Sequence, residues 1–266
     1  MSVSCERDGP VAIITIDRPE ARNAVDPNTA HALFAAFKDV EADEGVAVSI
    51  LTGAGGAFCA GADLKAVASG ERFAPAAPGA GPMGPSRLLA DRESAEPGIS
   101  LSKPLIAAVE GHAVAGGLEL ALLADLRVAA DSAVFGVFCR RWGVPLIDGG
   151  TARLPRVIGQ GRALDMILTG RAVSAREAYD WGLVNRLAPE GEALRAALAL
   201  AHEIARFPQA CLRADRASVF AGWSLDMAEA LAREAKRGVP VIAREGAAGA
   251  ARFVGGAGRG GDFSAT

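Results

Sequence analysis

An apolar run that leads through a glycine-rich turn into a second apolar segment constrains the fold of this chain most. The run is Pro104–Val109, and the second segment is Leu118–Ala124. A short apolar run bounded by turn residues is typical of a buried strand, and the segment after the glycines suits a helix. Gly111, Gly116 and Gly117 lie between the two and let the chain turn tightly. The sequence therefore predicts a strand, a glycine turn and a helix in succession.

A similar unit comes earlier in the chain. The runs Val11–Ile16 and Ala47–Thr52 are rich in β-branched residues and end at turn residues, which is typical of buried strands. Between them, from about Asn28 to Glu44, apolar side chains recur at helical spacing. Shorter strands are expected at Leu126–Ala130 and Ala133–Phe135. Strands that alternate with helices predict an α/β core.

A capping box marks the start of a later helix. Ser174 can cap the helix, and Glu177 follows three residues later. Gly182 stands where this helix should stop, and Leu183–Leu187 returns to strand character.

The last ~70 residues are rich in Ala, Leu and Arg at helical spacing, with breaks expected near Pro208 and Gly222. We therefore expect two parts: a core formed by residues 1–195 and a helical region formed by residues 196–266. Between Ala66 and Leu101 the periodic pattern fails, because the segment is rich in Pro, Gly and Ala and cannot hold a regular element. A loop of this length is either a substrate lid or a disordered insertion.

Charge and cysteine usage exclude several classes of protein. The chain has 28 Lys and Arg against 31 Asp and Glu, a net charge of -3, so it lacks the basic excess that nucleic-acid binding requires. Its four cysteines form no CxxC pair or Cys/His cluster, which argues against a zinc site and a disulfide framework. No signal sequence and no run of ~20 apolar residues is present, so we expect a cytoplasmic protein without a membrane segment.

Two segments of small residues can bring backbone amides close to a ligand. In Phe58–Leu64, which follows a glycine-rich turn, nothing larger than a cysteine stands between Phe58 and Asp63, although such turns are more often structural. In the second segment, Gly116 and Gly117 open a helix with exposed amides, and Glu119 follows within the first turn. The neighbours of Glu119 are apolar, so this carboxylate either needs a buried partner or points into a cleft.

These blocks, taken together, resemble the crotonase, or enoyl-CoA hydratase/isomerase, superfamily. The resemblance is specific and covers most of the chain, and five blocks occur in the family's order and spacing: Arg18–Ala24, Phe58–Leu64, Ala107–Ala121, Gly149–Leu154 and Thr169–Val184.

The resemblance implies a spiral of repeated ββα units and a C-terminal helical region that builds a homotrimer or a dimer of trimers. It also implies that the amides of Ala62 and Gly116 hold the thioester oxygen of an acyl-CoA substrate while negative charge builds on it. Glu119 would be the acid or base. Neither a metal nor a cofactor beyond the CoA of the substrate is expected. The expected substrate-binding residues are Arg22, Ala24, Ala60, Asp63, Leu64, Gly117 and Cys139.

The chain departs from the family at one catalytic position. Family hydratases use two glutamates, and an ungapped count places Cys139 where the second belongs. Cys139 could be a nucleophile, but a packed and inert thiol is the preferred interpretation. Asp148 could supply the missing acid or base, or it could simply begin an Asp-Gly turn. The neighbouring arginines, Arg140 and Arg141, could face solvent or pair with acidic groups, Asp148 among them.

The leading prediction is therefore an enoyl-CoA hydratase or double-bond isomerase. Isomerisation needs only one proton shuttle, so the loss of a glutamate harms it less than it harms water addition. A CoA-thioester hydrolase or decarboxylase on the same fold is the alternative enzyme, and a non-catalytic acyl-CoA-binding trimer is the alternative from another class. His112, in the glycine-rich turn, is expected to shape that turn.

Overall fold

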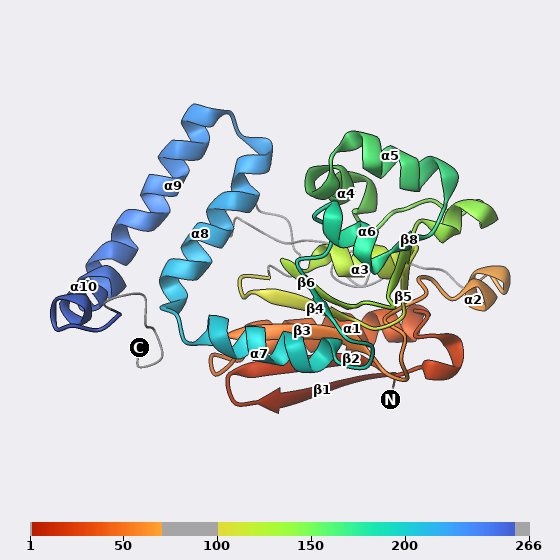
Figure 1. The fold of residues 1–266 in the computed structure, drawn as a ribbon, viewed down its shortest axis with the longest axis horizontal. Coiled ribbons are helices and arrows are strands. Elements are labelled where there is room, and N and C mark those ends of the chain that lie inside the picture. The colour runs from red at the N-terminus through yellow and green to blue at the C-terminus, as the bar shows by residue number, and fades with distance from the viewer. Residues whose placement is uncertain (1, 71–100, 259–266) are drawn as a thin grey trace.

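A six-stranded sheet forms the centre of the molecule in the computed structural model, which describes residues 2–70 and 101–258 (Figure 1). Its strands lie in the order β1-β2-β3-β4-β6-β9, with β1 antiparallel to β2 and the other neighbouring pairs parallel. Their bounds are β1 Val3–Asp8, β2 Val11–Ile16, β3 Val48–Gly53, β4 Leu105–Val109, β6 Leu126–Ala130 and β9 Arg186–Ala188.

A second, three-stranded sheet contains β5 (His112–Val114), β7 (Val134–Gly136) and β8 (Val173–Ser174) in that order. The chain passes from β4 in the large sheet to β5 in the small one and then into a helix, α3. It then repeats the passage from β6 to β7 and enters a short 3-10 helix, η2, followed by α4. This repeat confirms the predicted α/β fold built from ββα turns.

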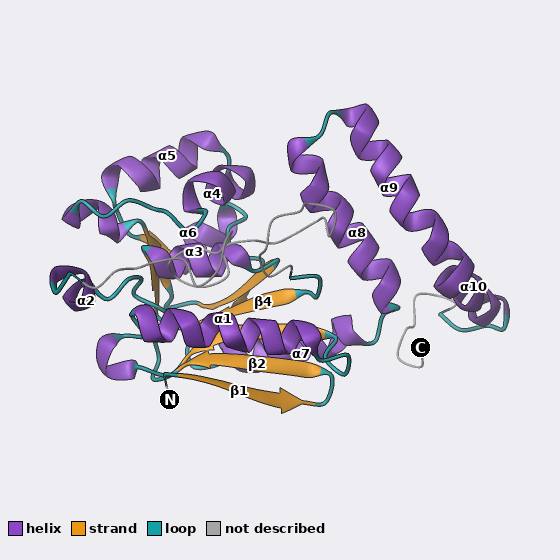
Figure 2. Ribbon diagram, turned by 180° about the vertical axis from the view of Figure 1, so that it is seen from behind, coloured by secondary structure: helices purple, strands orange, loops and turns teal. Residues whose placement is uncertain are grey.

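Helices surround both sheets (Figure 2). The side chain of Asp26 caps the first turn of α1 by accepting the Thr29 N–H at 2.7 Å, and Leu33 and Phe37 are fully buried on the inner face of this helix. The helices of the core are α1 Pro27–Ala42, α2 Leu64–Ala68, α3 Gly116–Leu123, α4 Gly150–Ile158, α5 Gln160–Thr169, α6 Ala175–Asp180 and α7 Ala193–Ala205, with short helices η1 Pro19–Ala21 and η2 Phe138–Trp142.

Both faces of the large sheet are covered, because alternate side chains of a strand point to opposite faces. On β3, Val48 and Ile50 pack in a cluster with Leu200 of α7. Leu51 belongs to the larger cluster on the other face, which also holds Phe37 of α1. Every residue of α3 is buried in or beside this larger cluster. A rigid packed layer therefore holds the N-terminus of α3 in place.

The C-terminal helices form an arm that extends from the core. Figures 1 and 2 show α8 (Gln209–Ala221) beside α9 (Met227–Val241), joined by η3 (Gly222–Ser224). A π-helical turn, η4 (Ile242–Gly246), leads from α9 into α10 (Ala247–Val254). By contrast, α7 contains the predicted boundary at residues 195 and 196 and packs on the sheet. The predicted division into two parts stays a prediction.

Most predicted elements agree with the structure, but the predicted strand Leu183–Leu187 is wrong over its first half. The N–H groups of Leu183 and Val184 both donate to the Ala178 carbonyl, at 2.8 and 3.1 Å, and so close the end of α6. The chain meets β6 at Asn185, whose N–H donates to the Arg127 carbonyl at 2.9 Å, and strand β9 itself begins at Arg186. The predicted breaks near Pro208 and Gly222 are confirmed.

The predicted loop Ala66–Leu101 falls mainly outside the described residues, and its first residues belong to α2. In the described ranges, the structure contains no helix that is both long and apolar enough to cross a membrane.

Candidate active site

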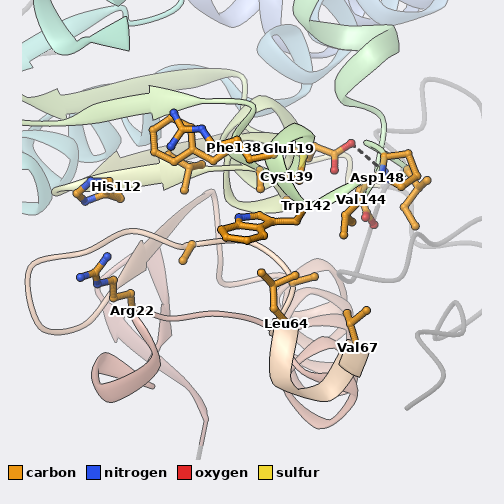
Figure 3. Close-up of a pocket in the computed structure, with 18 residues that line it drawn as sticks. Arg22, Leu64, Val67, His112, Glu119, Phe138, Cys139, Trp142, Val144 and Asp148 are labelled. Carbon is orange, nitrogen blue, oxygen red and sulfur yellow. Dashed lines mark hydrogen bonds between the residues drawn. The ribbon is translucent and has the colours of Figure 1, made fainter. Parts of the chain in front are cut away.

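A pocket of about 630 Å³ lies between η2, the N-terminus of α3 and the segment before α2. Of the predicted site residues, those that line it are Arg22, Ala60, Ala62, Leu64, Gly116, Glu119, Cys139 and Asp148. Residues far apart in the sequence thus meet around one cavity. Figure 3 shows Glu119 and Asp148 together on one side of this pocket and Arg22 and His112 on the other.

The two small-residue segments are joined directly by backbone hydrogen bonds. The Cys59 N–H donates to the His112 carbonyl at 2.9 Å, and the Val114 N–H donates to the Cys59 carbonyl at 3.1 Å. Gly117 lies against the same carbonyl, because a Cβ on Gly117 would come within 2.0 Å of the Cys59 oxygen. The close approach therefore requires a glycine, and it sets the spacing between the two segments.

The backbone pairing of Ala62 leaves its amide free of protein partners among the described residues. Val25 forms a parallel bridge with Ala62, and its hydrogen bonds use the Gly61 carbonyl and the Asp63 N–H. In a parallel pair the residue between those two groups turns its own N–H to the opposite side. Ala62 lines the pocket, and its N–H lies on the side of the segment that faces away from Val25.

The Gly116 amide is the first of α3 and has no acceptor within its own helix. It follows Ala115, whose φ of 54° and ψ of -125° place this residue in a strained conformation. A Cβ on Gly61 would lie 2.8 Å from the Gly116 nitrogen, which shows how near the two segments are. Within the described ranges, neither the Ala62 nor the Gly116 N–H donates a hydrogen bond to the protein. Two residues that line one cavity therefore have backbone donors without a described protein acceptor.

Glu119 is the acidic residue in the first turn of α3, and only 3% of its surface is exposed. Its Oε1 accepts the N–H of Asp148 at 2.9 Å and the N–H of Gly150 at 2.8 Å. Burial raises the pKa of Glu119 to about 7, the two backbone N–H groups oppose this rise, and the nearby Asp148 charge adds to it. This carboxyl group can therefore both donate and accept a proton near neutral pH.

Asp148 lies beside Glu119 and is 6% exposed. Its backbone N–H, rather than its side chain, makes the hydrogen bond drawn as a dashed line in Figure 3. Its carbonyl accepts Nη1 of Arg153 at 2.9 Å. Asp148 therefore lines the pocket, as the interpretation as a second acid or base requires. It also belongs to the turn that holds Glu119, in agreement with the interpretation as the start of an Asp-Gly turn.

Cys139 lies in η2, lines the pocket and is 7% exposed. Burial raises the pKa of its thiol, and the Glu119 charge raises it further, so the thiol is neutral near pH 7. The predicted packed thiol is confirmed. Arg140 and Arg141 do not bind Asp148: they donate to the carbonyls of Ile167 and Gly170, at 3.1 and 2.8 Å, because these carbonyls at the end of α5 lie against η2.

Three predicted substrate-binding residues have other contacts and are absent from the pocket lining. Asp63 caps α2 by accepting the Lys65 N–H at 3.0 Å and forms an ion pair with Arg18 at 3.1 Å. The Ala24 carbonyl accepts a hydrogen bond from the same arginine. Gly117 packs on the Cys59 carbonyl. These residues shape the segments that carry the two amides.

Sequence reasoning missed an apolar wall of the pocket. It is formed by Val67, Phe138, Trp142, Val144, Pro145 and Ile147. Trp142 is 69% exposed and Ile147 58% exposed, which is unusual for large apolar side chains on a surface without a ligand. The concentration of aromatic and aliphatic residues between Phe138 and Ile147 is the sequence signal that indicates this wall.

A comparison with models of protein families matches residues 6–254 to the family described as enoyl-CoA hydratase/isomerase. The chain belongs to this family. The expected membership of the crotonase superfamily is therefore confirmed. Enoyl-CoA hydratase EchA19 of Mycobacterium tuberculosis is 43% identical over 202 residues, which are 75% of this chain and 73% of that protein. Carnitinyl-CoA dehydratase of Salmonella arizonae is 42% identical over 204 residues, 76% and 74% of the two chains.

Solved structures of the enoyl-CoA hydratase/isomerase family agree with the fold described above. That of enoyl-CoA hydratase EchA1 from Mycobacterium marinum covers 95% of each chain at 39% identity with a TM-score of 0.84. That of an enoyl-CoA hydratase from Mycobacterium tuberculosis gives the same values. This family member is an enzyme of the hydratase-like lyase type that transforms acyl-CoA thioesters.

Proposed function

We propose that this enzyme adds water reversibly across the double bond of a 2-enoyl-CoA thioester. The observation that carries the proposal is the meeting of three groups in one pocket: the Ala62 and Gly116 amides, which donate to no described residue, and the Glu119 carboxyl with a pKa of about 7. The amides hold the thioester oxygen, and Glu119 transfers protons. The reaction is proposed to need neither a metal nor a separate cofactor.

The chemistry follows from where charge develops. When the oxygen of water bonds to C3 of the enoyl group, the electron pair of the double bond moves toward the thioester, and negative charge accumulates on its oxygen. The two amides stabilise this enolate. Glu119 accepts a proton from the attacking water and delivers a proton to C2, which leaves a 3-hydroxyacyl-CoA. Elimination of water is the same sequence reversed, and the name of one relative, a dehydratase, describes that direction.

Asp148 is the proposed second acid. It lines the pocket, is buried, and lies near enough for its charge to raise the pKa of Glu119. Cys139 occupies the position where a second glutamate was expected, and its neutral thiol cannot serve as a base near pH 7. The CoA thioester is proposed to bind along Arg22, Ala60 and Leu64, because these residues line the same pocket.

The test supplies 2-enoyl-CoA substrates of several chain lengths and acyl shapes and identifies products by mass spectrometry. We expect a gain of one water molecule, a loss of at least about 100-fold in kcat for E119Q, and a smaller loss for D148N. C139A, which removes a neutral group, should retain activity. Full activity of E119Q, or release of free CoA thiol in place of hydration, would contradict the proposal.

Double-bond isomerisation is a second candidate, favoured by the thiol of Cys139 beside a single well-held carboxyl. One group that removes a proton from C2 and returns it to C4 suffices for this reaction. A 3-enoyl-CoA substrate distinguishes the two: conversion to the 2-enoyl isomer without a change of mass identifies an isomerase. Mass gain from the 2-enoyl substrate alone identifies a hydratase.

The C-terminal arm is proposed to assemble the chain into a homotrimer or a dimer of trimers. Large apolar side chains on the arm are exposed in the single chain: Val219, Met227, Leu231, Val239, Ile242, Phe253 and Val254. Between α8, α9 and η4 lies a further, largely apolar hollow of about 460 Å³. Burying such a surface against a second copy would stabilise the assembly by the hydrophobic effect. A cytoplasmic location stays a prediction.

A further inference from the structure

Arg153 is a buried cation directly behind the catalytic turn. It lies in the first turn of α4, is 8% exposed, and does not line the pocket. Its Nη1 donates to the Asp148 carbonyl at 2.9 Å. A buried guanidinium loses its hydration, so its position requires specific compensation by the groups around it. One of those groups, the Asp148 carbonyl, belongs to the turn that holds Glu119.

The turn from Asp148 to Gly150 forms hydrogen bonds with Glu119 on one side and with Arg153 on the other. On one face, the N–H groups of Asp148 and Gly150 both bind Oε1 of Glu119. On the other face, the carbonyl of Asp148 binds Arg153. The guanidinium therefore binds the peptide unit between Asp148 and Gly149, which lies between the two peptide units whose N–H groups bind the carboxyl.

Gly149 makes this contact possible. Its φ is +96°, and a Cβ at this position would come within 2.3 Å of Nη1 and 2.9 Å of Cζ of Arg153. Any larger residue would displace the guanidinium and strain the backbone. On the other side of the turn, a Cβ on Gly150 would come within 2.9 Å of Cγ and Oε1 of Glu119. Both glycines bring the turn into direct contact with a charged side chain.

The charge of Arg153 also affects the protonation of Glu119. Its positive charge lowers the pKa of Glu119, whereas burial and the Asp148 charge raise it. In return, Glu119 and Asp148 both oppose the fall that burial causes in the pKa of Arg153. In the described part of the chain, the Cys139 thiol of η2 is a further titratable neighbour of Glu119, and it is neutral. Among the described residues that shift the pKa of Glu119, Arg153 is the one with a positive charge.

We propose that Arg153 is a positioning residue of this enzyme: by gripping the Asp148–Gly150 turn, it orients the Glu119 carboxyl for proton transfer without contacting the substrate. The inference rests on the proposed function of Glu119. A shift of a reacting group by about 1 Å can cost about 100-fold in rate, so a residue outside the pocket can control turnover through this turn.

The test compares R153M and R153K with R156M, a matched change one helical turn's length further along α4, where Arg156 is exposed. R153M should lower kcat by about 10- to 100-fold and leave KM within about twofold, since no substrate contact is lost. The limb of the pH–rate profile that reports Glu119 should move up by about one pH unit, because the opposing charge is gone. R153K should keep that limb near its wild-type position and recover part of kcat.

A measurement without turnover separates this inference from the proposed function. The carboxyl stretch of protonated Glu119, identified by infrared difference against E119Q, can be titrated in each variant. If E119Q remains fully active, the proposed function fails, whereas the infrared titration still reports the effect of Arg153 on the carboxyl.

A Glu119 titration and a kcat in R153M equal to those of R156M would overturn the inference. If R153M does not fold, R153K decides: a kcat equal to that of an R156K control would overturn the inference. A kcat of R153K below that of R156K, with the Glu119 titration near its wild-type position, would support the inference.

Discussion

Glu119 carries a charge at a place where charge is costly. The side chain is almost fully buried, and the two backbone N–H groups on Oε1 only partly compensate for the lost hydration. The consequence is a pKa of about 7 in the folded protein against 4.5 for an ordinary glutamate. The folded state therefore binds a proton that the unfolded state has already released between these two pH values.

This difference predicts how stability depends on pH. Between pH 4.5 and 7 the folded state holds more protons at Glu119, so its contribution to the free energy of unfolding falls as pH rises and levels off above about pH 7. E119Q cannot ionise, and its amide oxygen can still accept the two N–H groups. We therefore expect E119Q to be more stable than wild type at pH 8 and nearly equal at pH 4.5.

Urea unfolding at both pH values measures the difference. E20Q, at an exposed glutamate of η1, is the control: it keeps Glu119, so its free energy of unfolding should follow that of wild type at both pH values. An E119Q variant that is less stable than wild type at pH 8 would show that the ionised carboxyl stabilises the fold, contrary to this account.

At the scale of elements, the site depends on how closely α3 approaches the segment before α2. Gly117 is the second residue of α3, and its missing Cβ allows the Cys59 carbonyl to lie against the helix. Two elements that touch through backbone atoms cannot adjust by moving a side chain. Substitution must therefore move a helix that is buried along its whole length.

The prediction is that G117A destabilises the protein by about 1–3 kcal/mol and lowers kcat/KM, because the Gly116 and Ala62 amides move apart. Gly161 provides a matched control: it is also the second residue of a helix, α5, and a Cβ there would meet nothing within 4 Å. G161A should gain up to about 1 kcal/mol in stability and keep its activity. Thermal unfolding measures the stability of the two variants, and steady-state kinetics measures their kcat/KM. Equal effects would show that the close approach is not required.

At the scale of the whole molecule, core and arm differ in how they are stabilised. The core buries apolar side chains on both faces of its large sheet, whereas α9 and α10 expose theirs. Glu245 joins the end of the arm to its beginning by accepting the N–H groups of Ala210 and Cys211, at 3.1 and 2.8 Å. The arm thus has a defined shape but an apolar surface that a second copy would cover.

We expect V239D to dissociate the proposed oligomer, because Val239 is 62% exposed on α9 and a carboxylate there would be buried without a partner in the assembly. L168D, at a 70% exposed leucine of α5 outside the arm, is the matched control. Sedimentation velocity measures the mass of each variant. A wild-type protein that sediments as a monomer would contradict the proposed assembly, and a V239D variant of unchanged mass would place the interface elsewhere.

The sequence by itself determined strands β2, β3, β4, β6 and β7, the helix α3 and the two small-residue segments, because each of these depends on periodicity or on residues close together in the chain. It predicted strands β2 and β6 to the residue, and five ordered blocks indicated the family. It did not predict β1, which lies at the edge of the large sheet and carries exposed polar side chains.

Only the tertiary structure decided what surrounds Glu119. Its two hydrogen-bond donors lie 29 and 31 residues away in the sequence, and its pKa depends on how α3 packs against α4. The same holds for Asp63, whose charge pairs with Arg18, 45 residues away, rather than facing the pocket. A sequence pattern reports whether a residue is buried, but burial, charge and donors together set a pKa, and folding alone brings them to one place.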